Sequence, residues 1–96
     1  MILLHVTYHL LKENAGEYVQ MLEQSGLPAV FRGERGNIRY DYFLPAMRSD
    51  QLLLIEAWES EEALCAHMRT EHFQRLSGYK EAFVKETEIQ KFYVGQ

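Results

Sequence analysis

Glu56, Trp58 and His67 have the types and spacing that proton-transfer chemistry needs. Glu56 interrupts an apolar run, and strand alternation places it on the same face as Leu54 and Trp58. A buried carboxylate without a partner costs several kcal/mol, so Glu56 should be protonated, hydrogen-bonded or paired. Free histidine titrates near pH ~6.5, close to working pH. We therefore expect His67 to be the catalytic acid or base, steadied by Glu56, with Trp58 lining a substrate pocket.

Three further residues are candidate contacts to a substrate. Asn37 and Tyr40 could donate hydrogen bonds to a substrate or an oxyanion. His72 follows His67 closely and is the reserve base if His67 points away. The competing interpretation is structural: a solvated Glu56 near a strand end, Trp58 in the core and His67 facing water.

The remaining histidines and the cysteine do not indicate a metal site or a nucleophile. His5 and His9 would share a strand face but lie ~13 Å apart at ~3.3 Å per residue. One ion with ligands at ~2.1 Å cannot take both. The spacing of His67 and His72 does not match the HExxH motif of zinc proteases. Cys65 is expected to pack as a small buried hydrophobic residue rather than to act as a nucleophile. From the histidine spacings and the lack of a cofactor-binding motif, we predict neither a metal nor a cofactor.

Composition bounds the class of protein. The chain has 96 residues, 47% of them hydrophobic, which predicts one globular domain spanning 1–96. No apolar run approaches the ~20 residues of a membrane span, and no signal peptide is visible at the start. A net charge of −4, with scattered arginines, argues against nucleic-acid binding. One cysteine cannot form an internal disulfide, so a cytoplasmic location is expected.

Hydrophobic periodicity predicts the elements that position these residues. Strands are expected over 2–11, 37–44, 51–59 and 87–94. A helix capped by Asn14 should end near Gly26 and Pro28, or resume after a kink through Val30 and Phe31. Ser60 and Thr70 are expected to cap two further helices.

The order βαββααβ predicts an α+β fold of the ferredoxin-like type, an antiparallel sheet with helices on one face. The first and third strands are the most apolar and should be central. The other sheet face then needs a cover, and the chain has no further helix to supply one. A second copy is the expected cover, which predicts a homodimer.

The block from Glu56 to Phe73 resembles the antibiotic biosynthesis monooxygenase superfamily of small dimeric α+β-barrel proteins. The matching residues are Glu56-x-Trp58-Glu59-Ser60, Ala66-His67, Thr70 and His72-Phe73, with Gly36-Asn37-x-Arg39-Tyr40-Asp41 upstream. The resemblance covers essentially the whole chain. It implies a dimeric α+β barrel that acts on a small molecule.

Differences from the family pattern indicate which branch of the superfamily the chain resembles most. Leu54 and Leu64 stand where polyketide-oxidising members have Asn and Tyr. His67 replaces a tryptophan of the haem-degrading members, and Ser77 replaces their haem-ligating histidine. The His…Thr-x-His arrangement is most similar to the branch of quinol monooxygenases and autoinducer-2-phosphate isomerases.

This resemblance implies a cofactor-independent monooxygenase that oxidises a quinol or similar electron-rich aromatic compound with oxygen. A deprotonated quinol can itself reduce oxygen, so the protein needs a base, an oxyanion donor and a dry pocket. An isomerase of a small, possibly phosphorylated dicarbonyl needs the same groups. For that reaction Arg39 and Arg48 are the candidates for binding a phosphate, although the sequence does not show where they lie relative to the site. A dimer that binds a small ligand without transforming it is the third interpretation.

Overall fold

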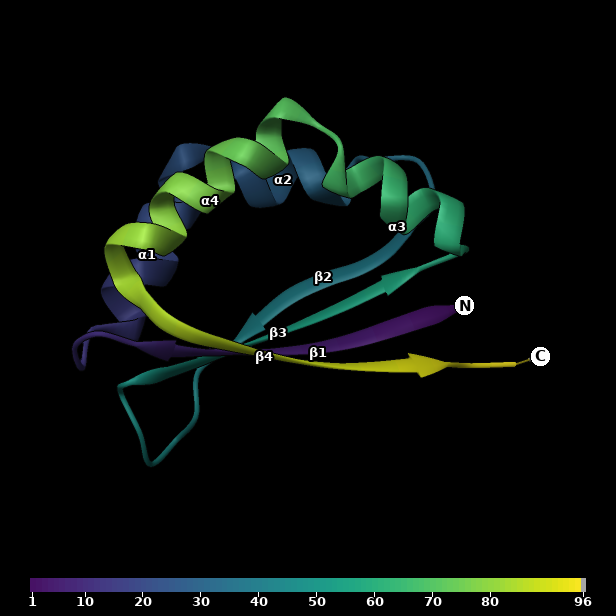
Figure 1. The fold of residues 1–96 in the computed structure, drawn as a ribbon. Helices are drawn as coiled ribbons and strands as arrows, with labels where there is room; N and C mark the ends of the chain where they lie inside the picture. Colours follow the sequence, from purple (N-terminus) through teal and green to yellow (C-terminus); the bar gives the residue numbers. More distant parts are fainter. Residues whose placement is uncertain (96) are drawn as a thin grey trace.

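The computed structural model describes residues 1–95 as one sheet covered by one layer of helices (Figure 1). The elements, in chain order, are β1 (Ile2–Leu10), α1 (Ala15–Ser25), α2 (Leu27–Arg32), β2 (Asn37–Phe43), β3 (Gln51–Trp58), α3 (Glu61–Met68), α4 (Glu71–Phe83) and β4 (Val84–Tyr93). This confirms the predicted α+β, ferredoxin-like order βαββααβ, with the first helical segment split in two. No helix within this range is long and apolar enough to cross a membrane.

The sheet is antiparallel with strand order β2-β3-β1-β4, so the two most apolar strands are central, as predicted. Its register aligns the site residues across three strands. Leu4 on β1 lies opposite Glu56 on β3, and Tyr40 on β2 lies on the other side of Glu56. These three side chains therefore share the face that the helices cover.

Local sequence signals explain where the helices begin and end. Ser60 and Thr70 cap α3 and α4, their hydroxyls accepting hydrogen bonds from the backbone N–H groups of Ala63 and Phe73. Gly26, with φ of +80°, separates α1 from α2, which is the predicted interruption. Asn14 occupies the cap position of α1, but its side chain makes no capping hydrogen bond.

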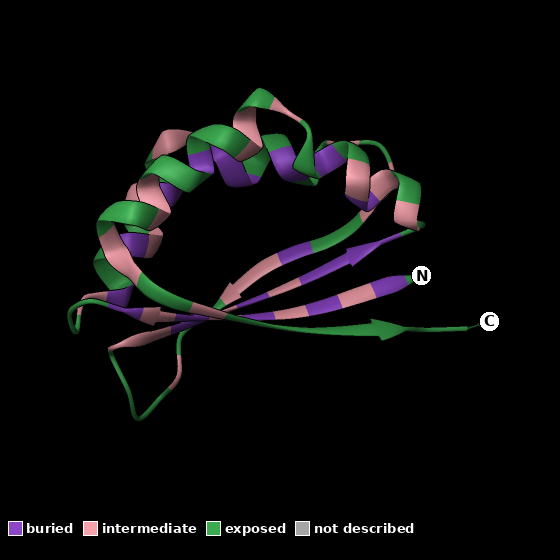
Figure 2. Ribbon diagram, viewed as in Figure 1, coloured by how far each residue is buried: buried purple, intermediate pink, exposed green. Residues whose placement is uncertain are grey.

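The last strand differs from the expectation. It begins at Val84, directly after α4, rather than at residue 87. The helix passes into the strand without a loop, so the chain leads directly from the helical layer into β4, an edge strand of the sheet (Figure 1). Most of β4 is exposed, in contrast to the alternating burial of β1 (Figure 2).

The core lies between the helices and one sheet face. Alternate residues of β1 from Ile2 to Leu10 are buried there, together with Tyr18, Phe31 and Trp58. All four helices lie on this side, and the opposite face of the sheet has no helix over it (Figure 1). That open face carries apolar side chains, among them Leu3, Phe43, Leu53, Ile55 and Phe92.

Candidate active site

His67 belongs to α3. Its side chain is enclosed by aromatic rings, and the residue is only 3% exposed. The ring centroid of Trp58 is 4.7 Å from that of His67, and those of Phe31 and Phe73 are 4.6 and 5.1 Å away. The hydroxyl of Thr70 donates to the carbonyl of His67 at 2.9 Å. Thr70 therefore fixes the end of α3 that carries the imidazole.

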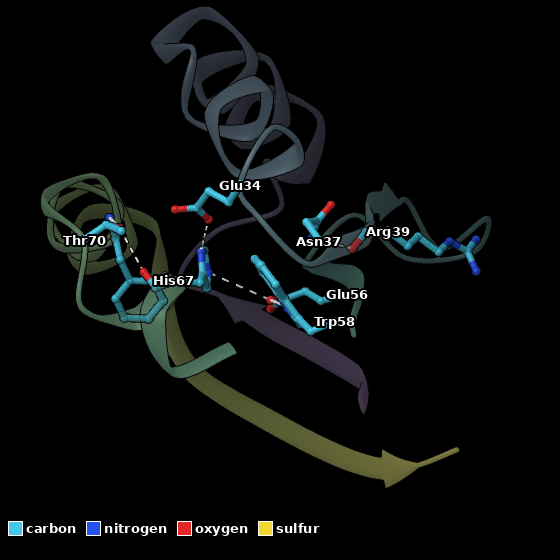
Figure 3. Close-up of polar contacts among 8 residues, drawn as sticks. Glu34, Asn37, Arg39, Glu56, Trp58, His67 and Thr70 are labelled. Carbon is cyan, nitrogen blue, oxygen red and sulfur yellow. Dashed lines mark hydrogen bonds and ion pairs between the residues drawn. The ribbon is translucent and has the colours of Figure 1, made fainter. Parts of the chain in front are cut away.

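A carboxylate orients the imidazole. Nδ1 of His67 lies 2.6 Å from Oε1 of Glu34, which is in the turn between α2 and β2 (Figure 3). When Nδ1–H donates to this carboxylate, Nε2 is left as the proton acceptor. The same carboxylate then stabilises the imidazolium that forms once Nε2 takes a proton.

Glu56 lies on the other side of the imidazole. Its Oε1 is 4.0 Å from Nε2 of His67, which is too long for a hydrogen bond, and it accepts one from the indole N–H of Trp58 at 3.0 Å. Burial raises the pKa of the Glu56 carboxyl, while the Trp58 hydrogen bond and the charges of His67 and Lys80 oppose that rise. Burial therefore favours the protonated form of Glu56 relative to that of an exposed glutamate.

A cavity of about 70 Å³ lies under α3 and α4, and His67 is part of its wall. Its wall is largely apolar, and its polar side chains are Tyr8, Tyr40, Glu56, His67, Lys80 and Thr87. Burial holds the pKa of Tyr40 well above its usual 10.0, so its phenol stays neutral and can donate a hydrogen bond. Ile89 of β4 also lines the cavity and is 62% exposed, which places the mouth at the β4 edge.

A larger hollow of about 530 Å³ lies beside the loop between β2 and β3. The charged side chain in its wall is Arg48, whose Nε and Nη2 each donate to Asp50 at 2.9 Å. This pairing leaves the hollow without an available acid or base. The smaller cavity next to His67 is therefore the candidate site.

The structure brings together only part of the predicted set. Glu56, His67 and Tyr40 meet at the cavity, whereas Asn37 and His72 do not line it. The Asn37 amide donates to the carbonyl of Arg39 at 3.2 Å, and the pairing of β2 with β3 is irregular between these two residues. Trp58 lies on the helix side of the sheet, as the alternation predicted. It packs against His67, donates its indole N–H to Glu56 and is not among the residues that line this cavity, so its contact with a substrate stays a prediction.

Two residues were missing from the sequence-based set. Glu34 lies between Gly33 and Gly36, and only the folded chain brings it to His67. Lys80 lines the cavity from α4. Within residues 1–95, no group of three or more His, Cys, Asp or Glu side chains could hold a metal ion.

Comparison with known proteins identifies the family. The sequence profile of antibiotic biosynthesis monooxygenases, abbreviated ABM, matches residues 1–78. The chain belongs to this family. Over 74 residues it is 31% identical to "Putative monooxygenase YcnE" of Bacillus subtilis (strain 168), which covers 77% of this chain and 76% of that protein.

Solved structures of other proteins share the fold. The crystal structure of PA3566 from Pseudomonas aeruginosa aligns with a TM-score of 0.82 and 29% identity, covering 99% of this chain and 94% of the other. SnoaB from Streptomyces nogalater, described as a cofactor-independent oxygenase, aligns with a TM-score of 0.81 over 99% of this chain and 93% of its own. Its identity is 14%, so this likeness concerns the fold alone.

Proposed function

We propose that this ABM protein is a cofactor-independent monooxygenase that oxidises a quinol or similar electron-rich small aromatic compound with oxygen. The observation that carries the proposal is the orientation of His67. Glu34 engages Nδ1, and His67 lines a largely apolar cavity. An oriented imidazole in a water-poor site is suited to take a proton from a phenolic hydroxyl.

The reaction needs no electrons beyond those of the substrate. Once Nε2 of His67 has taken the phenolic proton, the electron-rich anion can reduce oxygen and form a carbon–oxygen bond at the ring. Loss of water from the resulting hydroperoxide leaves one oxygen atom on the ring as a carbonyl, and the other leaves in the water molecule. The neutral phenol of Tyr40 is the donor placed to stabilise the oxyanion. Glu56 is a second proton-exchanging group at the same cavity wall.

Substrate entry must enlarge the cavity. About 70 Å³ is less than the ~150 Å³ of a cavity that accommodates benzene. Met68 and Lys80 are the long, flexible side chains in the wall, and Met68 is 45% exposed. Movement of the Met68 side chain toward solvent would admit a ring without displacing the sheet.

The open face of the sheet supports the further proposal that two copies form a homodimer. Leu3, Leu53 and Ile55 project from the two central strands on the side that no helix covers. Burying such a row against a second copy removes apolar surface from water.

Sedimentation should therefore show a dimer, and Ile55→Lys should dissociate it. The matched change Val30→Lys, on an exposed residue of α2, should leave it intact. A folded wild-type monomer at micromolar concentration would contradict this assembly.

Oxygen consumption with a panel of substituted quinols tests the proposed reaction. We expect oxygen uptake with formation of a hydroxylated quinone, and loss of uptake in the His67→Ala variant. Conversion of a dicarbonyl compound without oxygen uptake would instead establish an isomerase. The arginines considered for phosphate binding give that reaction no support, since Arg39 and Arg48 pair with Asp41 and Asp50 at 2.9 Å. Binding of quinols without turnover would show that the site only holds a ligand.

A further inference from the structure

Among residues 1–95, Lys80 is the one lysine or arginine side chain that lines the cavity. It extends from α4, and its Nζ lies 5.5 Å from the ring centroid of Tyr8. Tyr8 on β1 is opposite Thr87 on β4, and both of these residues also line the cavity. Lys80 therefore provides a positive charge at the end of the cavity formed by Tyr8 and Thr87.

The ammonium group of Lys80 is available to a ligand. Among residues 1–95, no carboxylate lies within 4.0 Å of its Nζ and no acceptor is hydrogen-bonded to it. Two other cations are paired by contrast: Lys91 lies 2.5 Å from Glu61, and Arg39 lies 2.9 Å from Asp41. Burial lowers the pKa of Lys80, and the charge of Glu56 opposes that change. A half-buried ammonium over an aromatic face is stabilised by an anion that replaces its lost hydration.

The two ends of the cavity differ in chemistry. Leu4 marks the end formed by Glu56 and Tyr40, and Tyr8 lies four residues further along β1, which is roughly 13 Å of strand. Between these ends the wall is apolar, made by side chains that include Val6, Leu64 and Leu76. An acid–base group thus lies at one end, a cation at the other, and an apolar wall between them.

We propose that Lys80 binds an anionic group on the substrate and selects aromatic compounds that carry a carboxylate opposite the reactive hydroxyl. The apolar wall contacts the ring, the hydroxyl reaches Nε2 of His67, and the carboxylate lies against the ammonium of Lys80. The substrate class is therefore a hydroxylated aromatic acid. This proposal rests on the proposed function for the identity of the reacting end, but the anion site is measurable without turnover.

The test uses two probes that differ in one charge, 3,4-dihydroxyphenylacetate, in which one hydroxyl lies opposite the carboxymethyl group, and its methyl ester. Binding is followed by fluorescence of Trp58, the sole tryptophan, which packs against His67 at the site. In the wild-type protein the acid should bind roughly 10- to 100-fold more tightly than the ester, the usual worth of a charge-assisted contact. High salt should reduce this preference, because the mouth of the cavity is open to solvent.

Three variants assign the preference to Lys80. Lys80→Met keeps the length of the side chain but removes its charge, and should bring the two affinities together. Lys80→Arg keeps the charge and should retain most of the preference. Lys12→Met makes the same charge change at an exposed lysine and should leave the preference unchanged.

The outcomes separate this proposal from the proposed reaction. Equal affinities in the wild-type protein, undetectable binding of both probes, or a preference that survives Lys80→Met would each overturn the anion site. A Lys80-dependent preference without oxygen uptake would support the anion site and contradict the monooxygenase. Oxygen uptake with no dependence on Lys80 would support the monooxygenase and contradict the anion site.

Discussion

Nδ1 of His67 lies 2.6 Å from Oε1 of Glu34, although 33 residues separate them in the chain. A tight turn brings them together: the N–H of Glu34 donates to the carbonyl of Phe31, and the N–H of Asn37 donates to the carbonyl of Glu34, both at 3.1 Å. The Glu34 side chain is 18% exposed and that of His67 is 2% exposed. Solvent therefore competes little for this contact, and the imidazole is held in one orientation.

Replacing Glu34 by Gln should lower kcat for a quinol that the wild type oxidises. The expected loss is roughly 10- to 100-fold, comparable to removal of a carboxylate that orients a metal-binding histidine. Glu34 acts through His67 and does not line the cavity, so the affinity for a quinol measured by Trp58 fluorescence should change little. Glu34→Asp should recover part of kcat.

Glu62→Gln is the matched control, since Glu62 is exposed on the same helix as His67. Its kcat should equal that of the wild type. A loss of quinol affinity in Glu34→Gln with unchanged kcat would show that Glu34 contributes to binding rather than to orientation of the base.

The base itself is tested by His67→Ala. Removing a positioned general base should lower turnover by roughly a hundredfold or more. The substitution leaves a space walled by Phe31, Trp58 and Phe73, so added imidazole should restore part of the activity. Oxygen uptake with and without imidazole measures both effects.

His72→Ala serves as the comparison, because His72 does not line the cavity. Its turnover should be unchanged. If His72→Ala abolished turnover while His67→Ala did not, the catalytic role would belong to the reserve histidine.

Short-range patterns predicted the fold and one side of the site. Alternation within 51–59 places Leu54, Glu56 and Trp58 on one face, and the cap at Ser60 starts the helix that returns His67 over them. These features depend on neighbouring residues in the chain, so periodicity and capping chemistry reveal them.

The rest of the site depends on tertiary packing. The contact of Glu34 joins two segments 33 residues apart, and no local pattern encodes it. The position of Asn37 depends on the irregularity that alters its register with β3, and strand alternation does not reveal such an irregularity. Lys80 lay outside the predicted set because a lysine on a helix is normally expected to face solvent. In the structure its side chain reaches over Tyr8 of β1.

Glu56→Gln should stabilise the protein at neutral pH. Burial raises the folded-state pKa of Glu56 above its ordinary value of 4.5, so the folded protein binds this proton more readily than the unfolded chain does. Stability therefore falls as the pH rises from about 4.5 through the folded-state pKa, and the cost persists above it. Gln carries no charge and can still accept the hydrogen bond from Trp58.

Thermal unfolding at two pH values measures this effect. The midpoint of Glu56→Gln should exceed that of the wild type at pH ~7, and the two midpoints should converge at and below pH ~4. Glu62→Gln, at an exposed position, should show no such convergence. A difference that stays constant across the pH range would show that the ionisation of Glu56 does not set its stability.

Gly36 ends the turn that positions Glu34, and its substitution by Ala should destabilise the fold. Its φ is +85°, a conformation that costs a residue with a side chain roughly 1–2 kcal/mol. A Cβ at this position would also lie 2.5 Å from Cβ of Ala63, on the helix that carries His67. Gly36→Ala should therefore lower the free energy of unfolding by roughly 2 kcal/mol or more, measured by urea denaturation.

Gly16→Ala isolates the strain from the general effect of replacing a glycine. Gly16 lies within α1 and has no positive φ. A Cβ added there would have no heavy atom of a neighbouring residue within 4 Å. This control should be stabilised by about 0.5–1 kcal/mol, because Ala favours the helix more than Gly does. Because Gly36 holds both the turn of Glu34 and the approach of α3, kcat of Gly36→Ala should also fall under conditions where the variant is folded. Equal stability changes in the two variants would show that α3 yields to the added methyl group, and that this turn does not fix the distance between Glu34 and His67.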